Sequence, residues 1–175
     1  MKILLDQEQV RSGVERLAQE IAATYGNHPL TIIGIMTGSV VLLADVIRQL
    51  AMPLRVGVVQ TSSYRGTQRG PLTINAELML DITGRDVLLI DDIFDTGNTL
   101  EEVKQLMFEL GPSSLRAAVL LRKSGRQEVG ARPDFVAFEI PDEFVVGYGL
   151  DYNDEYRNLP YVAALEPADL QSVRA

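Results

Sequence analysis

The sequence predicts an α/β fold in which helices flank a mainly parallel, twisted sheet. Short, nearly all-apolar runs, typical of strands covered on both faces, alternate with segments of helical periodicity. Right-handed crossovers join strands that alternate with helices, which makes the sheet mainly parallel. The chain has 175 residues, of which 46% are hydrophobic, so it is long enough for one sizeable core. We therefore expect a single domain over residues 1–175.

The first helix is expected to begin after Asp6, because Gln9 stands three residues later as in a capping box. Gly26 is suited to end this helix. The residues of its apolar face are Val10, Val14, Leu17, Ile21 and Tyr25.

The middle of the chain repeats the alternation of strand and helix. Residues 40–51 are expected to form a helix that Pro53 stops, and Leu100 to Leu110 recur at helical spacing until Gly111. The polar loop 65–71 suggests a hairpin. The expected strands are residues 30–36, 55–63, 87–90, 115–121, 135–140 and 144–150.

Composition narrows the classes of function. The net charge of −8 argues against nucleic-acid or anionic-membrane binding, and no apolar run reaches about 18 residues. The absence of cysteine excludes disulfides and thiolate metal sites. We therefore expect a cytoplasmic protein that does not bind nucleic acid or membrane.

Four loops follow predicted strands and should meet at one edge of the sheet, where ligands of parallel sheets bind. These loops lie within residues 34–39, 90–99, 122–125 and 149–153.

The second of these loops, with Gly97 between Thr96 and Thr99, leads into a helix and has the features of an anion site. Helix-start amides and threonine hydroxyls both donate hydrogen bonds to phosphate oxygens. Alternatively, Asp95 or Thr96 is only a helix N-cap.

Asp91 and Asp92 follow a buried strand and should alternate sides, so they are not expected to chelate one ion together. The pair is suited to sugar hydroxyls or to a Mg²⁺ ion that keeps most of its water. A solvated strand end is the alternative.

The segment IDDIFDTGNTL (90–100) resembles the 5-phosphoribosyl 1-pyrophosphate (PRPP) signature of the type I phosphoribosyltransferases, and 132–162 is similar to the C-terminal region of their purine-salvage branch. The resemblance implies the type I phosphoribosyltransferase fold, with a small hood and a mobile hairpin loop. It also implies Mg²⁺-dependent transfer of the 5-phosphoribosyl group from PRPP to hypoxanthine or guanine, with xanthine as a third candidate, giving IMP or GMP and pyrophosphate. A homodimer or homotetramer is expected.

The resemblance also implies roles for individual residues. Asp95 matches the general base, although it can instead only order its loop. The PRPP-binding residues, for the 5′-phosphate and ribose, are Asp91, Asp92, Asp95, Thr96, Gly97, Asn98 and Thr99. The residues implied to bind pyrophosphate are Thr37, Gly38 and Arg157. Those implied to bind the purine are Lys123, Phe144, Val145 and Asp151. The metal ligands implied are Asp151, Asp91 and Asp92, and the lid residues are Ser63 and Tyr64.

One departure concerns Thr37, which stands where the family usually has lysine. Backbone contacts can persist there, but the charge is missing. Two competing functions use the same fold: a regulator that binds RNA, for which no basic face is evident, and a PRPP-sensing module, which would be expected to lack Asp95 or Asp151.

Overall fold

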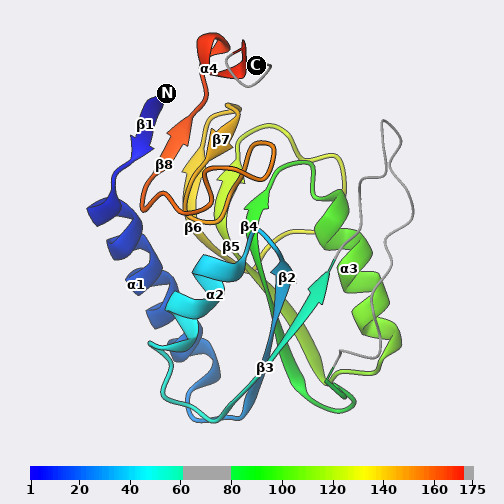
Figure 1. The fold of residues 1–175 in the computed structure, drawn as a ribbon. Coiled ribbons are helices and arrows are strands. Elements are labelled where there is room, and N and C mark those ends of the chain that lie inside the picture. The colour runs from blue at the N-terminus through cyan, green and yellow to red at the C-terminus, as the bar shows by residue number, and fades with distance from the viewer. Residues whose placement is uncertain (61–79, 172–175) are drawn as a thin grey trace.

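The computed structural model describes residues 1–60 and 80–171, and these build a five-stranded sheet of order β3-β2-β4-β5-β6 (Figure 1). Every neighbouring pair in this sheet is parallel, which confirms the predicted fold class. In sheet order the strands are β3 Leu54–Gln60, β2 Leu30–Met36, β4 Asp86–Phe94, β5 Ser114–Lys123 and β6 Phe135–Ile140.

Helices cover both faces of the sheet. Helices α1 (Gln7–Tyr25) and α2 (Val40–Ile47) pack on one face, and α3 (Asn98–Glu109) lies on the other (Figure 1). Strand β4 divides its side chains between them, since Leu88 and Ile90 join the α1–α2 core while Val87 and Leu89 join the α3 core. None of the helices in the described ranges is long and apolar enough to cross a membrane.

A small antiparallel sheet of order β1-β8-β7 forms the predicted hood above the carboxyl edge (Figure 1). Its strands are β1 Lys2–Leu5, β8 Val162–Ala164 and β7 Val145–Val146, and α4 Pro167–Gln171 follows. The predicted hairpin loop 65–71 and the lid residues Ser63 and Tyr64 lie outside the described residues.

Local signals placed α1 correctly. Asp6 accepts a hydrogen bond from the Gln9 amide, and the Gln9 side chain accepts one from the Asp6 amide, so the capping box is present. The Gly26 amide donates to the Ala22 carbonyl at the other end.

Three predicted elements differ from the structure by more than three residues at one end. Helix α2 stops at Ile47 rather than at residue 51, because the chain turns there and buries Leu50 and Met52 on its way to β3. The strand predicted over 144–150 shortens to β7, since positive φ angles at Gly147, Tyr148 and Gly149 end the extended backbone.

The third concerns β4, which continues past residue 90 to Phe94 because β5 is long enough to pair with it. Asp91 and Asp92 therefore belong to the strand itself.

A close packing contact between α1 and β6 yields a prediction. A Cβ on Gly13 would lie 2.0 Å from the Phe138 ring. We expect Gly13→Ala to lower the free energy of unfolding, because overpacking costs about 1–3 kcal/mol, more than the roughly 1 kcal/mol of helix propensity that alanine adds. Urea unfolding with the exposed Ser12→Ala as control measures this, and a stabilised Gly13→Ala protein would contradict it.

Candidate active site

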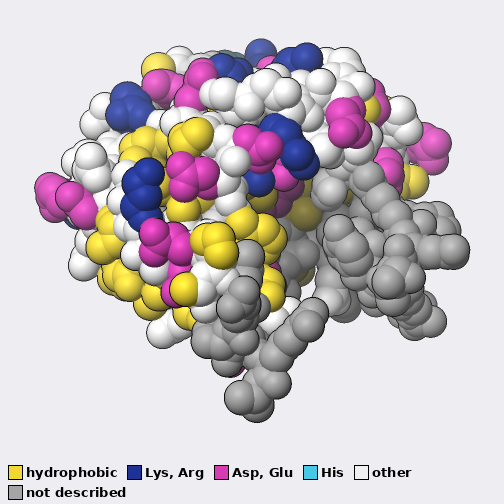
Figure 2. Space-filling view, turned by 90° about the horizontal axis from the view of Figure 1, so that it is seen from above, with side chains coloured by type: hydrophobic (Ala, Val, Ile, Leu, Met, Phe, Trp, Pro, Cys, Tyr) yellow, Lys and Arg dark blue, Asp and Glu magenta, His cyan; other side chains and the backbone are white. Residues whose placement is uncertain are grey.

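A cavity of about 480 Å³ opens at the carboxyl edge of the parallel sheet. In a view from above this edge, acidic and basic side chains lie side by side near the middle of the face (Figure 2). Three of the four predicted loops contribute to its walls. The predicted site residues that line the cavity are Thr37, Gly38, Asp91, Asp92, Asp95, Thr96, Gly97, Thr99, Asp151 and Arg157.

The two adjacent acids of β4 sit at the floor of this cavity. Asp91 accepts a hydrogen bond from the Asp92 amide at 3.0 Å, and Asp92 accepts one from the Ile93 amide at 2.8 Å. Burial, together with the neighbouring carboxylate, raises the pKa of Asp91 well above its usual range. With Asp91 only 8% exposed, the alternative of a fully solvated strand end is wrong for this residue.

Gly38 is wedged between β4 and the loop that follows β7. A Cβ on Gly38 would lie 1.7 Å from Oδ2 of Asp92, so the carboxylate occupies the place of a side chain. A Cβ on Gly149 would in turn lie 2.2 Å from the Gly38 carbonyl oxygen. The Met36–Thr37 peptide bond in this loop is cis. The loop therefore offers backbone groups to the cavity and has no room for a side chain at residue 38.

Asp151 and Arg157 form a second polar group in the lining of the cavity. Arg157 Nη2 lies 2.8 Å from Asp151 Oδ1, and Nη1 donates to the Gly149 carbonyl at 2.7 Å. The other Asp151 oxygen accepts from the Asp154 amide at 3.0 Å. The guanidinium keeps further donors for an anion, because arginine has five N–H groups.

Tyr148 holds this part of the lining against α2. Its hydroxyl donates to Asp45 Oδ2 at 2.6 Å, while its backbone lies between Gly147 and Gly149 at a φ of 49°. Burial and the bond to Asp45 raise the pKa of Tyr148, so the hydroxyl stays a donor. Since α2 directly follows the Gly38 loop, this bond joins two parts of the lining.

The loop between β4 and α3 presents the start of a helix to the cavity. Gly97 is the N-cap residue, in a left-handed conformation with φ 91°, and it makes no side-chain capping bond. The alternative that Asp95 or Thr96 is the N-cap is therefore wrong. Phe94 and Val129 pack within 2.8 Å of where a Gly97 Cβ would lie, which explains the glycine. The Asn98 N–H lies 3.4 Å from Thr96 Oγ1, and this helix start lines the cavity, where its amides can bind an anion.

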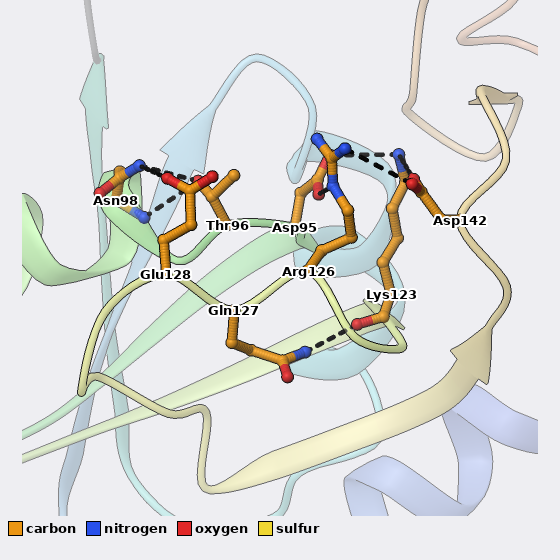
Figure 3. A network of polar contacts seen from close by, with 8 residues as sticks. All are labelled: Asp95, Thr96, Asn98, Lys123, Arg126, Gln127, Glu128 and Asp142. Atoms are coloured by element: carbon orange, nitrogen blue, oxygen red, sulfur yellow. Dashed lines mark hydrogen bonds and ion pairs between the residues drawn. The ribbon is translucent and has the colours of Figure 1, made fainter.

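Asp95 takes part in a ring of alternating charges (Figure 3). Its two oxygens lie 3.1 Å from Lys123 Nζ and 2.9 Å from Arg126 Nε. Asp142 closes the ring, since each of its oxygens lies 3.4 Å from one of the same two cations. Partial burial alone would raise the pKa of Asp95, but the hydrogen bonds from Arg126 and Lys123 outweigh it and hold that pKa below its usual value.

Three further predicted site residues, Phe144, Val145 and Asn98, are not part of the cavity lining. The Phe144 side chain is 50% exposed and meets the Tyr152 ring edge-on, with centroids 5.5 Å apart. Val145 is buried in β7. Asn98 points sideways, where its amide donates to Thr96 Oγ1 at 3.0 Å and to Glu128 at 3.3 Å (Figure 3).

Sequence reasoning missed Arg126 and Asp142. A usable signal existed for Asp142, because it comes two residues after β6, at the same carboxyl edge as the other loops. The signal for Arg126 was weaker, because only its nearness to Lys123 in the chain pointed to it. The direction of the Arg126 side chain depends on a turn at Gly125.

Comparison with known proteins gives consistent matches. The model of the phosphoribosyl transferase domain matches residues 1–153. The hypoxanthine-guanine phosphoribosyltransferase of Aquifex aeolicus (strain VF5) is 40% identical over 169 residues, or 95% of each chain. That of Staphylococcus epidermidis (strain ATCC 12228 / FDA PCI 1200) is 38% identical over 94% of this chain and 93% of its own.

Solved structures agree with the sequence matches. The hypoxanthine phosphoribosyltransferase of Trypanosoma cruzi, in complex with the product IMP, superposes with a TM-score of 0.87 and 35% identity, over 96% of this chain and 95% of that one. The hypoxanthine phosphoribosyltransferase of Staphylococcus aureus superposes with a TM-score of 0.90 and 35% identity, over 100% of this chain and 94% of that one.

The wedge at Gly38 yields a prediction. We expect Gly38→Ala to weaken binding of inorganic pyrophosphate with Mg²⁺ by about tenfold or more, because a displaced loop would lose backbone hydrogen bonds to the anion, and one hydrogen bond to a charged group is worth about 1.5–3 kcal/mol. Calorimetry on the variant, with Gly130→Ala as control, measures this. Gly130 has no heavy atom within 4 Å of its Cβ position. Equal affinity in both variants would contradict the prediction.

Proposed function

Because the chain belongs to the phosphoribosyltransferase family, we propose that the cavity at the sheet edge carries out the transfer reaction of purine salvage. The protein is an enzyme that moves the 5-phosphoribosyl group of PRPP to hypoxanthine or guanine and releases pyrophosphate. The observation that carries the assignment to this cavity is that a helix start with glycine as its N-cap directly follows the Asp95 that pairs with Lys123.

The phosphoribosyl group is proposed to bind along β4 and the start of α3. The amides and hydroxyls of Thr96 to Thr99 would hold the 5′-phosphate, a role supported by the first turn of α3, where the N-cap Gly97 supplies no side chain. Asp91 and Asp92 would accept hydrogen bonds from the ribose hydroxyls. Pyrophosphate would then lie against the backbone of Thr37 and Gly38, with Arg157 as its cation.

The purine is proposed to bind between Lys123 and Phe144. Two of the three Lys123 N–H donors face Asp95 and Asp142, which leaves one for the 6-oxo oxygen. An ammonium cannot accept a hydrogen bond from a 6-amino group, so adenine should be rejected. Phe144 would stack on the ring, and the Val145 backbone and the Asp151 region would contact its far edge.

Asp95 is proposed as the general base. As purine N9 forms its bond to C1′, the bond from C1′ to pyrophosphate breaks and its electron pair leaves with pyrophosphate. The N7–H bond breaks as well, and its proton moves to an Asp95 oxygen. An ionised carboxylate is needed for this step, and the two cations beside Asp95 favour that form.

Mg²⁺ is proposed as the cofactor, held by Asp151 with Asp91 and Asp92 in support. No cluster of three or more metal-binding side chains occurs in residues 1–60 and 80–171. This donor set fits Mg²⁺, which commonly uses one or two carboxylates and takes its other ligands from substrate and water. When bound, the ion would neutralise charge on pyrophosphate. A homodimer or homotetramer in the cytoplasm stays a prediction.

Pyrophosphate release is the direct test of the function. With PRPP and Mg²⁺ present, we expect release with hypoxanthine or guanine, and release with adenine and uracil at least about a hundredfold slower, as for sites that lose a buried hydrogen bond. Xanthine completes the panel. Activity with uracil would favour the regulatory alternative, and no activity with any oxopurine would overturn the proposal.

A further inference from the structure

We propose that Arg126 is a positioning residue for Asp95, which keeps this carboxylate oriented and ionised while Lys123 serves the purine. The inference rests on the proposed function, in which Asp95 accepts the purine proton. Its basis is the geometry of the charged ring around Asp95 (Figure 3).

The two cations of the ring differ in surroundings. The Lys123 side chain is 10% exposed and lies between two carboxylates, whereas the Arg126 side chain is 45% exposed at the rim. Arg126 uses Nε on Asp95 and Nη1 on Asp142, so one planar group fixes two acids at once. This geometry makes Arg126 the residue that fixes the direction of the Asp95 carboxylate.

The loop that carries Arg126 is tied to both neighbouring segments. The Ser124 amide donates to the Ile140 carbonyl at 3.0 Å, and the Gln127 side chain donates to the Lys123 carbonyl at 2.7 Å. The Glu128 amide donates to the Thr96 carbonyl at 2.9 Å, directly beside Asp95. Arg126 is therefore held in register with the phosphate-binding loop, which a freely moving surface arginine would not be.

A bound purine would add a hydrogen bond to Lys123 but not to Arg126. Once Lys123 donates a hydrogen bond to a 6-oxo oxygen, its positive charge interacts with the purine as well as with Asp95. Arg126 continues to donate to Oδ1, which leaves lone pairs on the carboxylate for the N7 proton. Without Arg126, Asp95 would be freer to rotate and would take up a proton at higher pH.

Several other charged groups belong to the elements around Asp95. Lys123 and Asp142 face it from the loops after β5 and β6, and Glu128 adds a negative charge near Arg126. Asp91 and Asp92 precede it on β4, and Asp151 and Arg157 line the same cavity. Because these groups stay unchanged in an Arg126 variant, differences between variants report the loss of one guanidinium.

The test compares Arg126→Gln, Arg126→Lys and a matched control, Arg122→Gln. Arg122 lies on β5 and pairs with Glu139, so its loss removes the same charge four residues away. The pH dependence of kcat/KM for hypoxanthine is measured for each, with the melting temperature as a check on folding.

The sign follows from the depressed pKa of Asp95: activity persists above that pKa and falls as pH drops through it. Loss of Arg126 raises that pKa. The acid limb of Arg126→Gln should therefore move to higher pH by about one unit, since a close cation lowers a carboxyl pKa by about 1–3 units. Arg126→Lys should restore part of the shift, KM for PRPP should change less than kcat, and Arg122→Gln should overlay the wild type.

Two results would overturn the inference. One is an acid limb of Arg126→Gln that coincides with the wild type. The other is a loss of activity that is equal at every pH, which would indicate a purely structural effect. A wild-type protein without oxopurine transfer would instead overturn the proposed function together with this inference, so the two failures are distinguishable.

Discussion

The close approach of three backbone segments at the sheet edge is the constraint on which the rest of the site depends. Gly38 fits between the Asp92 carboxylate and the backbone at Gly149, with no space for a methyl group on either glycine. This contact brings the loop after β2, the end of β4 and the loop after β7 to one cavity. The Tyr148–Asp45 hydrogen bond supports the same arrangement, because it joins the loop after β7 to α2.

Around this contact the chemistry divides into an acidic floor and a charged ring. In the floor Asp91 is buried and Asp92 half-buried, and this desolvation raises the pKa of both carboxyls, which favours protonation unless hydroxyls or a cation face them. The ring instead places two cations on Asp95, which favours its ionised form. The carboxyls of Asp91 and Asp95, four residues apart, thus have opposite tendencies, and such divergence is the usual basis for separate binding and proton-transfer roles.

Sequence patterns were informative where the physics is local, and they failed where distant segments decide. The capping box of α1 and the apolar runs of the parallel strands depend on neighbours in the chain. The end of α2 and the extension of β4 depend on packing and on the length of a partner strand. Arg126 and Asp142 escaped notice because their meeting with Asp95 requires three strand ends to be side by side.

The most direct test of the central claim is a crystal structure of the protein with IMP bound. We expect the phosphate to lie on the amides of residues 96–99. The purine should lie with its 6-oxo oxygen within hydrogen-bond distance of Lys123 Nζ and with N7 facing Asp95, while Arg126 still contacts that carboxylate. A phosphate bound elsewhere, or a purine that leaves Asp95 and Lys123 paired only with each other, would contradict the account.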